Sequence, residues 1–152
     1  MIHGRMDQLS LTFSPDDDGT GELSAHLSAG GFAGSGAAWF NVEEVLAFCD
    51  KLEAYPLDPN ALPSLAGGYW DDSDCLQTTL LSIDVCPLDS SGKLMLSFLG
   101  QRDVDYPRKD QRRRIETWVT IGYNDANRLA QTMKTLVSDS SKELTITFEP
   151  LG

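Results

Sequence analysis

One short segment brings two aromatic residues next to three acidic ones: Tyr69, Trp70, Asp71, Asp72 and Asp74. Clustered carboxylates are the oxygen ligands that divalent cations prefer, so a metal-dependent enzyme is one interpretation of the segment. No histidine lies near it in the sequence, and we expect no metal there. Exposed aromatic side chains also anchor protein interfaces, and acidic neighbours attract a basic surface. The segment is therefore a candidate partner-binding site, with the alternative that both aromatic residues simply begin a core strand.

Two other patterns resemble ligand sites but lack the spacing that such sites need. The glycine-rich stretch 30–36 resembles a dinucleotide-binding loop, yet Trp39 and Phe40 separate it from the next predicted helix. Oxygen-bearing residues alternate over 16–22 as in a calcium loop, but an EF-hand needs a glutamate where this sequence has Leu27. We expect a bulged or closely packed strand in the first case and a hairpin turn in the second.

A nucleophilic enzyme would use the histidines or cysteines of the chain. The two histidines are His3, near the start, and His26, on the polar face of a predicted strand. Cys49 falls on the buried face of a predicted helix, where a thiol is usually inert. We therefore expect no catalytic residue and no cofactor.

Basic residues are concentrated in one stretch: Arg108, Lys109, Arg112, Arg113 and Arg114. Such a cluster is typical of nucleic-acid contacts. Aspartates are interspersed among these residues, however, and the chain has 23 acidic against 12 basic residues, for a formal net charge of −11. That charge repels phosphate backbones and anionic lipid and attracts basic partners. We predict a solvated, self-paired loop here, with no nucleic-acid or membrane partner.

Length and cysteine usage are typical of a single-domain protein in a reducing compartment. A chain of 152 residues can bury a full core, so residues 1–152 are expected to form one domain. Cys49, Cys75 and Cys86 are odd in number, and none belongs to a CxxC motif. No apolar run reaches the ~18 residues of a membrane helix, and the first residues lack the apolar stretch of a secretory signal. We expect a cytoplasmic protein with reduced thiols.

A β-hairpin is predicted at the centre of the chain. Apolar segments 76–85 and 93–99 flank a turn that runs from Asp89 to Gly92, residue types that suit a four-residue hairpin turn. Alternation places one set of apolar side chains on its inner face: Leu81, Ile83, Val85, Leu94, Leu96 and Phe98. Other strands are predicted around 9–13, 23–29, 37–40, 115–121 and 144–148. Segment 56–68 has three prolines and two glycines and is predicted to be a loop.

Two amphipathic helices are predicted between these strands. The first begins after Asn41, which can form a capping box with Glu44, and ends near Pro56. Its expected buried residues are Val42, Val45, Leu46, Cys49 and Leu52, with Phe48 as a further candidate. The second helix is capped by Asn124, and its apolar residues recur at helical spacing: Ala126, Leu129, Ala130, Met133, Leu136 and Val137. This order predicts an α+β fold, a mainly antiparallel sheet or sandwich with two amphipathic helices packed on it.

Several stretches of the chain carry a resemblance to known proteins. They are 36–40, which leads into 42–55, then 68–71, 92–98 and the helix predicted over 123–137, which follows its strand. In element order and in the position of apolar residues, these stretches resemble a group of small bacterial proteins that includes immunity proteins of polymorphic toxin systems. Such proteins bind one cognate toxin domain and block its active site, and they share no catalytic residues. The resemblance covers most of the chain and implies a toxin-binding protein.

The function expected from the sequence is therefore an immunity-type protein that binds and neutralises a cognate, basic toxin domain through an acidic surface. Two alternatives stay open. One is a small-ligand binding module with a pocket between helix and sheet near Trp39 or Trp70. The other is a metal-dependent enzyme that uses Asp71, Asp72 and Asp74.

Overall fold

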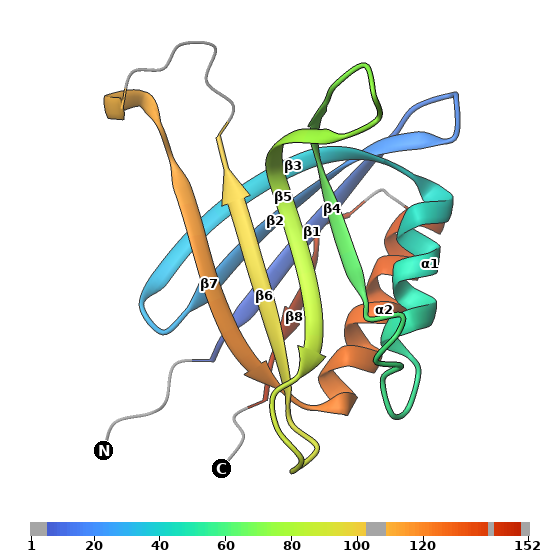
Figure 1. Cartoon of the computed structure of the whole chain (residues 1–152), viewed down its shortest axis with the longest axis vertical. Coiled ribbons are helices and arrows are strands. Elements are labelled where there is room, and N and C mark those ends of the chain that lie inside the picture. Colours follow the sequence, from blue (N-terminus) through green and yellow to red (C-terminus); the bar gives the residue numbers. More distant parts are fainter. Residues whose placement is uncertain (1–5, 103–108, 140–141, 150–152) are drawn as a thin grey trace.

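A computed structural model describes residues 6–102, 109–139 and 142–149, which form eight strands and two α-helices (Figure 1). The strands are β1 (Gln8–Pro15), β2 (Thr20–Ala29), β3 (Phe32–Asn41), β4 (Ser64–Trp70), β5 (Leu76–Pro87), β6 (Leu94–Gln101), β7 (Arg114–Ile121) and β8 (Leu144–Thr147). The helices are α1 (Val42–Leu52) and α2 (Tyr123–Ser138), and a 3-10 turn spans Lys109–Gln111. The predicted α+β fold is confirmed.

Two antiparallel four-stranded sheets pack against each other. One has the strand order β3-β2-β1-β8 and the other the order β4-β5-β6-β7. Strand β3 runs diagonally across the second sheet and contacts all four of its strands (Figure 1). Strand β8, the last one described, returns to pair with β1, the first. The crossing of β3 over the second sheet is the feature that shapes the candidate site.

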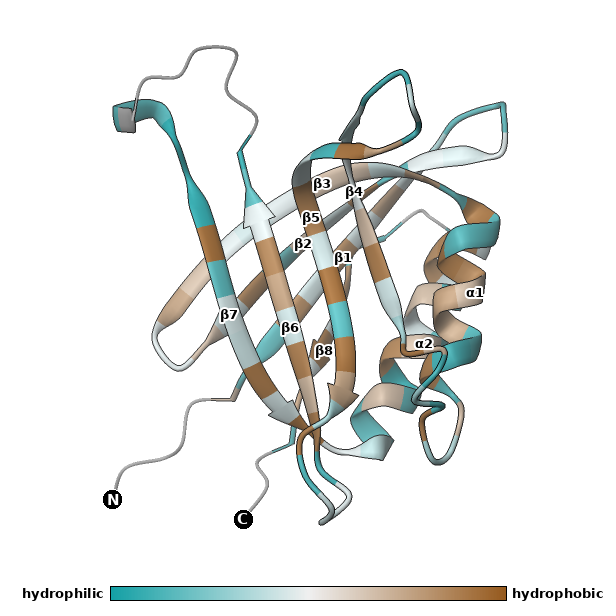
Figure 2. Ribbon diagram, in the orientation of Figure 1, coloured by the Kyte–Doolittle hydropathy of each residue, from teal (hydrophilic) through white to brown (hydrophobic). Residues whose placement is uncertain are grey.

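The core lies between the two sheets and under the helices. Apolar and polar residues alternate along the strands, so that one face of each strand is apolar (Figure 2). Every residue that alternation assigned to the inner face of the central hairpin is buried: Leu81, Ile83, Val85, Leu94, Leu96 and Phe98. The same holds for the first hairpin, where Leu9, Leu11 and Phe13 of β1 are buried.

The two helices pack on each other and close one side of the sandwich (Figure 1). Helix α1 contacts β3 and β4, and α2 contacts β1 and β8. The buried residues of α1 are Val45, Phe48, Cys49 and Leu52. Their spacing is i, i+3, i+4 and i+7, which leaves Leu46 beside the stripe and only half-buried. Within the described ranges no helix is both long and apolar enough to cross a membrane.

The start of α2 differs from the prediction, because the capping residue is Gly122 and not Asn124. A glycine has no side chain to cap with, so Asp125 supplies the acceptor: its Oδ2 accepts the Gly122 N–H at 3.1 Å. Asp125 Oδ1 pairs with Arg128 and accepts the Glu149 N–H at 3.4 Å. Arg128 in turn donates to the Thr147 carbonyl at 2.6 Å. The buried Asp125 therefore ties the first turn of α2 to the end of β8.

We expect Asp125→Ala to lower the free energy of unfolding by about 3 kcal/mol, because it removes the buried carboxylate that pairs with Arg128 and accepts the N–H groups of Gly122 and Glu149. Urea unfolding followed by tryptophan fluorescence measures this loss. The control is Lys51→Ala on the exposed face of α1, expected to change stability by no more than about 0.5 kcal/mol. If the two variants unfolded at the same urea concentration, this role for Asp125 would be wrong.

The loop predicted over 56–68 contains most of a strand, so that prediction was wrong from Ser64 onward. Its glycines do not break the strand; they allow close packing within it. A Cβ on Gly67 would lie 2.8 Å from the ring of Phe40, a buried residue of β3. The glycines that led to the loop prediction are therefore present because β4 lies close to β3.

Candidate functional site

Both strands have a glycine at the point where β3 crosses β6. A Cβ on Gly100 of β6 would lie 2.5 Å from the Ser35 carbonyl oxygen, and one on Gly36 of β3 would lie 2.8 Å from the Gly100 Cα. The two backbones are thus in direct contact, with no room for a side chain between them. Beyond this point the ends of β5, β6 and β7 continue past β3 (Figure 1). Within the stretch 30–36, predicted to be bulged or closely packed, Gly34 and Gly36 are closely packed, whereas Gly30 and Gly31 form the turn between β2 and β3.

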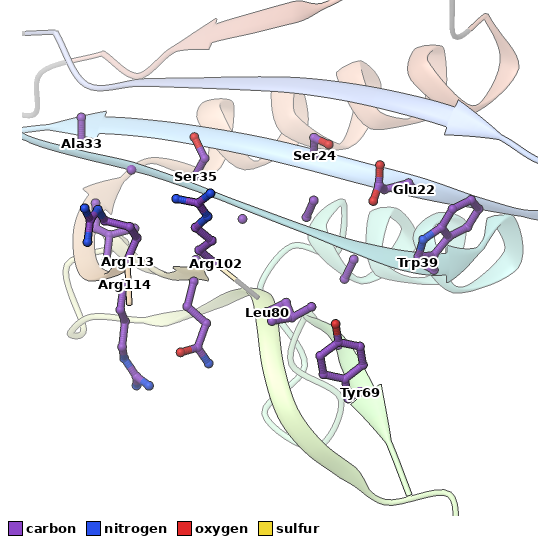
Figure 3. A pocket seen from close by; sticks show the side chains of 18 residues that line it. Glu22, Ser24, Ala33, Ser35, Trp39, Tyr69, Leu80, Arg102, Arg113 and Arg114 are labelled. Carbon is purple, nitrogen blue, oxygen red and sulfur yellow. The ribbon is translucent and has the colours of Figure 1, made fainter. Parts of the chain in front are cut away.

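A groove of about 750 Å³ lies between β3, with its neighbour β2, and these strand ends. Small residues of β3 form its floor: Ala33, Gly34, Gly36, Ala37 and Ala38. Trp39 and Tyr69 stand at one end, and Arg102, Arg113 and Arg114 stand at the other (Figure 3). Its volume is typical of small-molecule sites, which span about 300–1,000 Å³. The groove lies between strands, not between helix and sheet as the ligand-binding alternative expected.

Three large aromatic side chains near this groove are exposed to solvent. Trp39 is 54% exposed, Tyr69 47% and Trp70 53%. Tyr69 and Trp70 do lie in a strand, as one interpretation of the sequence held, but at its end and not in the core. Trp39 comes from the crossing strand and lines the same groove as Tyr69. Exposed aromatic groups that gather in this way are typical of binding surfaces.

Two acidic turns lie at the same end of the sandwich as these aromatic residues (Figure 1). The β1–β2 turn carries Asp16, Asp17 and Asp18, and the β4–β5 turn carries Asp71, Asp72 and Asp74. Asp16, Asp18 and Trp39 also share the lining of a shallow pocket of about 400 Å³ with Glu44. Trp39 therefore joins the groove to the β1–β2 turn. We call Trp39, Tyr69, Trp70 and the two turns the acidic-aromatic face.

Two aspartates of these turns accept hydrogen bonds from groups within their own turns. Asp71 Oδ1 accepts the N–H groups of Ser73 at 2.8 Å and Cys75 at 2.9 Å. Asp18 Oδ1 accepts the N–H and the hydroxyl of Thr20, and these hydrogen bonds hold the pKa of Asp18 below its usual range. In the described part of the chain no three His, Cys, Asp or Glu residues are grouped to hold a metal ion. Asp17, Asp72 and Asp74 are exposed, so both turns present carboxylates to solvent.

The candidate nucleophiles that the structure describes lie in two different environments. Cys49 is buried on α1, and burial raises the pKa of its thiol to about 12, so it is almost entirely protonated near neutral pH. His26 lies exposed on β2, with its Nδ1 2.6 Å from the Ser35 hydroxyl of β3. His3 lies outside the described residues.

The described part of the basic stretch makes contacts with its own neighbours in sequence. The Arg113 guanidinium donates to the carbonyl oxygens of Asp110 at 3.1 Å and Arg112 at 2.9 Å, and Arg114 lies 3.8 Å from Glu116. Arg108 and the side chain of Lys109 lie outside the described residues. Sequence reasoning did not connect this stretch with Arg102, because only the pairing of β6 with β7 brings Arg102 next to Arg113.

No protein-family model matches the sequence, and no curated protein matches it. The groove and the acidic-aromatic face are two surface features of the molecule that indicate a function.

Proposed function

We propose that this protein is an immunity-type inhibitor that binds and neutralises a cognate bacterial toxin domain through its acidic-aromatic face. The observation that carries the proposal is that half-exposed Trp39 and Tyr69 line one groove, with the exposed Trp70 next to Tyr69, beside two turns that carry three aspartates each. Aromatic side chains provide the anchors that dominate binding energy, and surrounding charges select and orient the partner.

The charge of the chain indicates what kind of partner fits. The formal net charge is −11, and the acidic turns add local negative charge around the aromatic anchors. A toxin domain that attacks nucleic acid needs a basic cleft, and an acidic protein can associate with such a cleft quickly and occupy the path of the phosphates. The proposed partner is therefore a basic toxin domain, bound without chemical modification.

The remaining parts of the proposal follow from this mode of action. The protein acts by stoichiometric binding, so it needs no catalytic residue, cofactor or metal. We place it in the cytoplasm, where its three free cysteines, Cys49, Cys75 and Cys86, stay reduced. Nucleic acid and membranes are not proposed as partners, because both repel an acidic surface.

The test is co-expression with the candidate toxin domain encoded by the neighbouring reading frame, each under its own inducible promoter. We expect this protein to restore growth and the purified pair to form a 1:1 complex. A toxin domain from an unrelated system serves as the specificity control and should remain lethal. If the cognate candidate proves toxic and stays equally toxic in the presence of this protein, the proposal is wrong for that pair.

A further inference from the structure

We propose that the arginine end of the groove binds a small organic anion, with its oxyanion between Arg102 and Arg113 and its apolar body on the floor formed by β3. This site is distinct from the acidic-aromatic face in charge and residues. Either proposal can therefore fail without the other.

The first step is that Arg102 and Arg113 lie directly opposite each other. The ladder between β6 and β7 pairs Gln101 with Arg114, and the Arg102 N–H continues it by donating to the Arg113 carbonyl at 2.8 Å. Residues opposite each other in an antiparallel pair have Cβ atoms about 5 Å apart and project to the same face. The two cationic side chains are therefore neighbours.

The second step is that both side chains face β3 and the groove. Gly100 and Ile115 are paired across the same ladder, two residues inward from the arginines. Gly100 abuts the backbone of β3, and a Cβ on Gly34 of β3 would lie 2.5 Å from Ile115. Because strand side chains alternate, Arg102 and Arg113 share this orientation. Figure 3 shows Arg102 reaching toward the part of β3 that carries Ser35.

The third step is that, in the part of the chain that the structure describes, no carboxylate forms a recorded ion pair with Arg102 or Arg113. Like charges directly opposite each other in a sheet are unfavourable. Within the described residues, Arg102 has no ion pair or side-chain hydrogen bond, and Arg113 uses its guanidinium only on the carbonyls of Asp110 and Arg112. An oxyanion between the two arginines would relieve this repulsion, since guanidinium groups bind carboxylate and phosphate in bidentate geometry.

The residues that line the rest of the groove indicate the shape and charge of the remainder of the ligand. Its floor has only backbone and small side chains, with Leu80 and Ile115 beside it, so a flat apolar group can lie against it. Glu22 lies toward the tryptophan end and disfavours a second negative group there. The ligand class is therefore a carboxylate or phosphate ester with one anionic end and an uncharged, planar apolar body.

Calorimetric titration of the whole chain with phenyl phosphate and benzoate tests the proposal, with benzamide as the neutral probe. We expect one or both anions to bind and benzamide to bind at least about tenfold more weakly. Binding of phenyl phosphate alone would assign a phosphate ligand, and binding of benzoate alone a carboxylate. Arg102→Gln and Arg113→Gln should each weaken binding at least about tenfold, whereas the charge-matched Lys51→Gln on α1 should not.

Thermal unfolding gives a second readout that also shows whether each variant is folded. The bound anion should raise the Tm of the wild type and of Lys51→Gln above its value in sodium chloride of equal ionic strength, and should leave the Tm of both arginine variants unchanged. The proposal is overturned if neither anion binds, if benzamide binds equally well, or if folded arginine variants keep wild-type affinity.

Discussion

Gly100→Val is expected to unfold the protein or to lower its free energy of unfolding by at least about 3 kcal/mol. A Cβ at this position would lie 2.5 Å from the Ser35 carbonyl oxygen, 2.7 Å from the Ser35 carbonyl carbon and 2.9 Å from the Gly36 nitrogen. All three are backbone atoms of β3, so no side-chain rotation can relieve the overlap. The crossing of the two sheets would have to open, which also separates the walls of the groove.

Urea unfolding of Gly100→Val and Ser97→Val measures this effect. Ser97 lies on the same strand as Gly100, but on its outer face and only partly buried. Valine suits a strand, so Ser97→Val should stay within about 0.5 kcal/mol of the wild type. Equal stability of the two variants would mean that β3 and β6 are not in backbone contact.

Trp39→Ala is expected to weaken toxin binding by about 2–4 kcal/mol, or roughly 30- to 1,000-fold. Trp39 shares one lining with Tyr69 and another with Asp16 and Asp18, so it is the aromatic residue that joins Tyr69 to the β1–β2 turn within the proposed interface. Its side chain is already 54% exposed, and removing it should leave the fold intact. Most of the loss should appear as faster dissociation, because an anchor acts after the complex has formed.

Trp118→Ala is the matched control for this measurement. Trp118 is 56% exposed, almost the same as Trp39, but it lies on β7 and lines neither the groove nor the acidic pocket. Surface plasmon resonance with the purified toxin domain should give wild-type kinetics for Trp118→Ala. If both variants dissociate at the same rate, the acidic-aromatic face is not the interface.

Periodicity predicted most of the fold, because the core depends on it directly. Alternation identified the inner faces of the hairpins, and helical spacing identified the buried residues of α2 from Ala126 to Leu136. The predictions were wrong where contacts with distant parts of the chain outweigh the local preference of a residue. Gly67 reads as a loop residue but makes room for Phe40, and Asn124 reads as a cap although Asp125 is the side chain that the structure buries and uses.

The candidate site could be predicted only in part. Tyr69, Trp70 and their acidic neighbours are close together in the sequence, so they could be predicted as a candidate site without the structure. Trp39 and Arg102 reach the groove because β3 crosses the second sheet and β6 pairs with β7. No local pattern encodes such a crossing. The one usable signal was the run of glycine and alanine over 30–38, which indicates a close approach of backbones.

The most direct test of the central claim is the association rate of the purified toxin domain as a function of salt. For the wild type, we expect this rate to fall about tenfold or more between low and high ionic strength. Neutralising the exposed carboxylates of both turns in Asp17→Asn/Asp72→Asn/Asp74→Asn should slow association at low salt and flatten this dependence. Asp89→Asn, in the turn at the opposite end, should keep the wild-type slope (Figure 1). An association rate that is independent of salt, or equal in the wild type and the triple variant, would contradict the account.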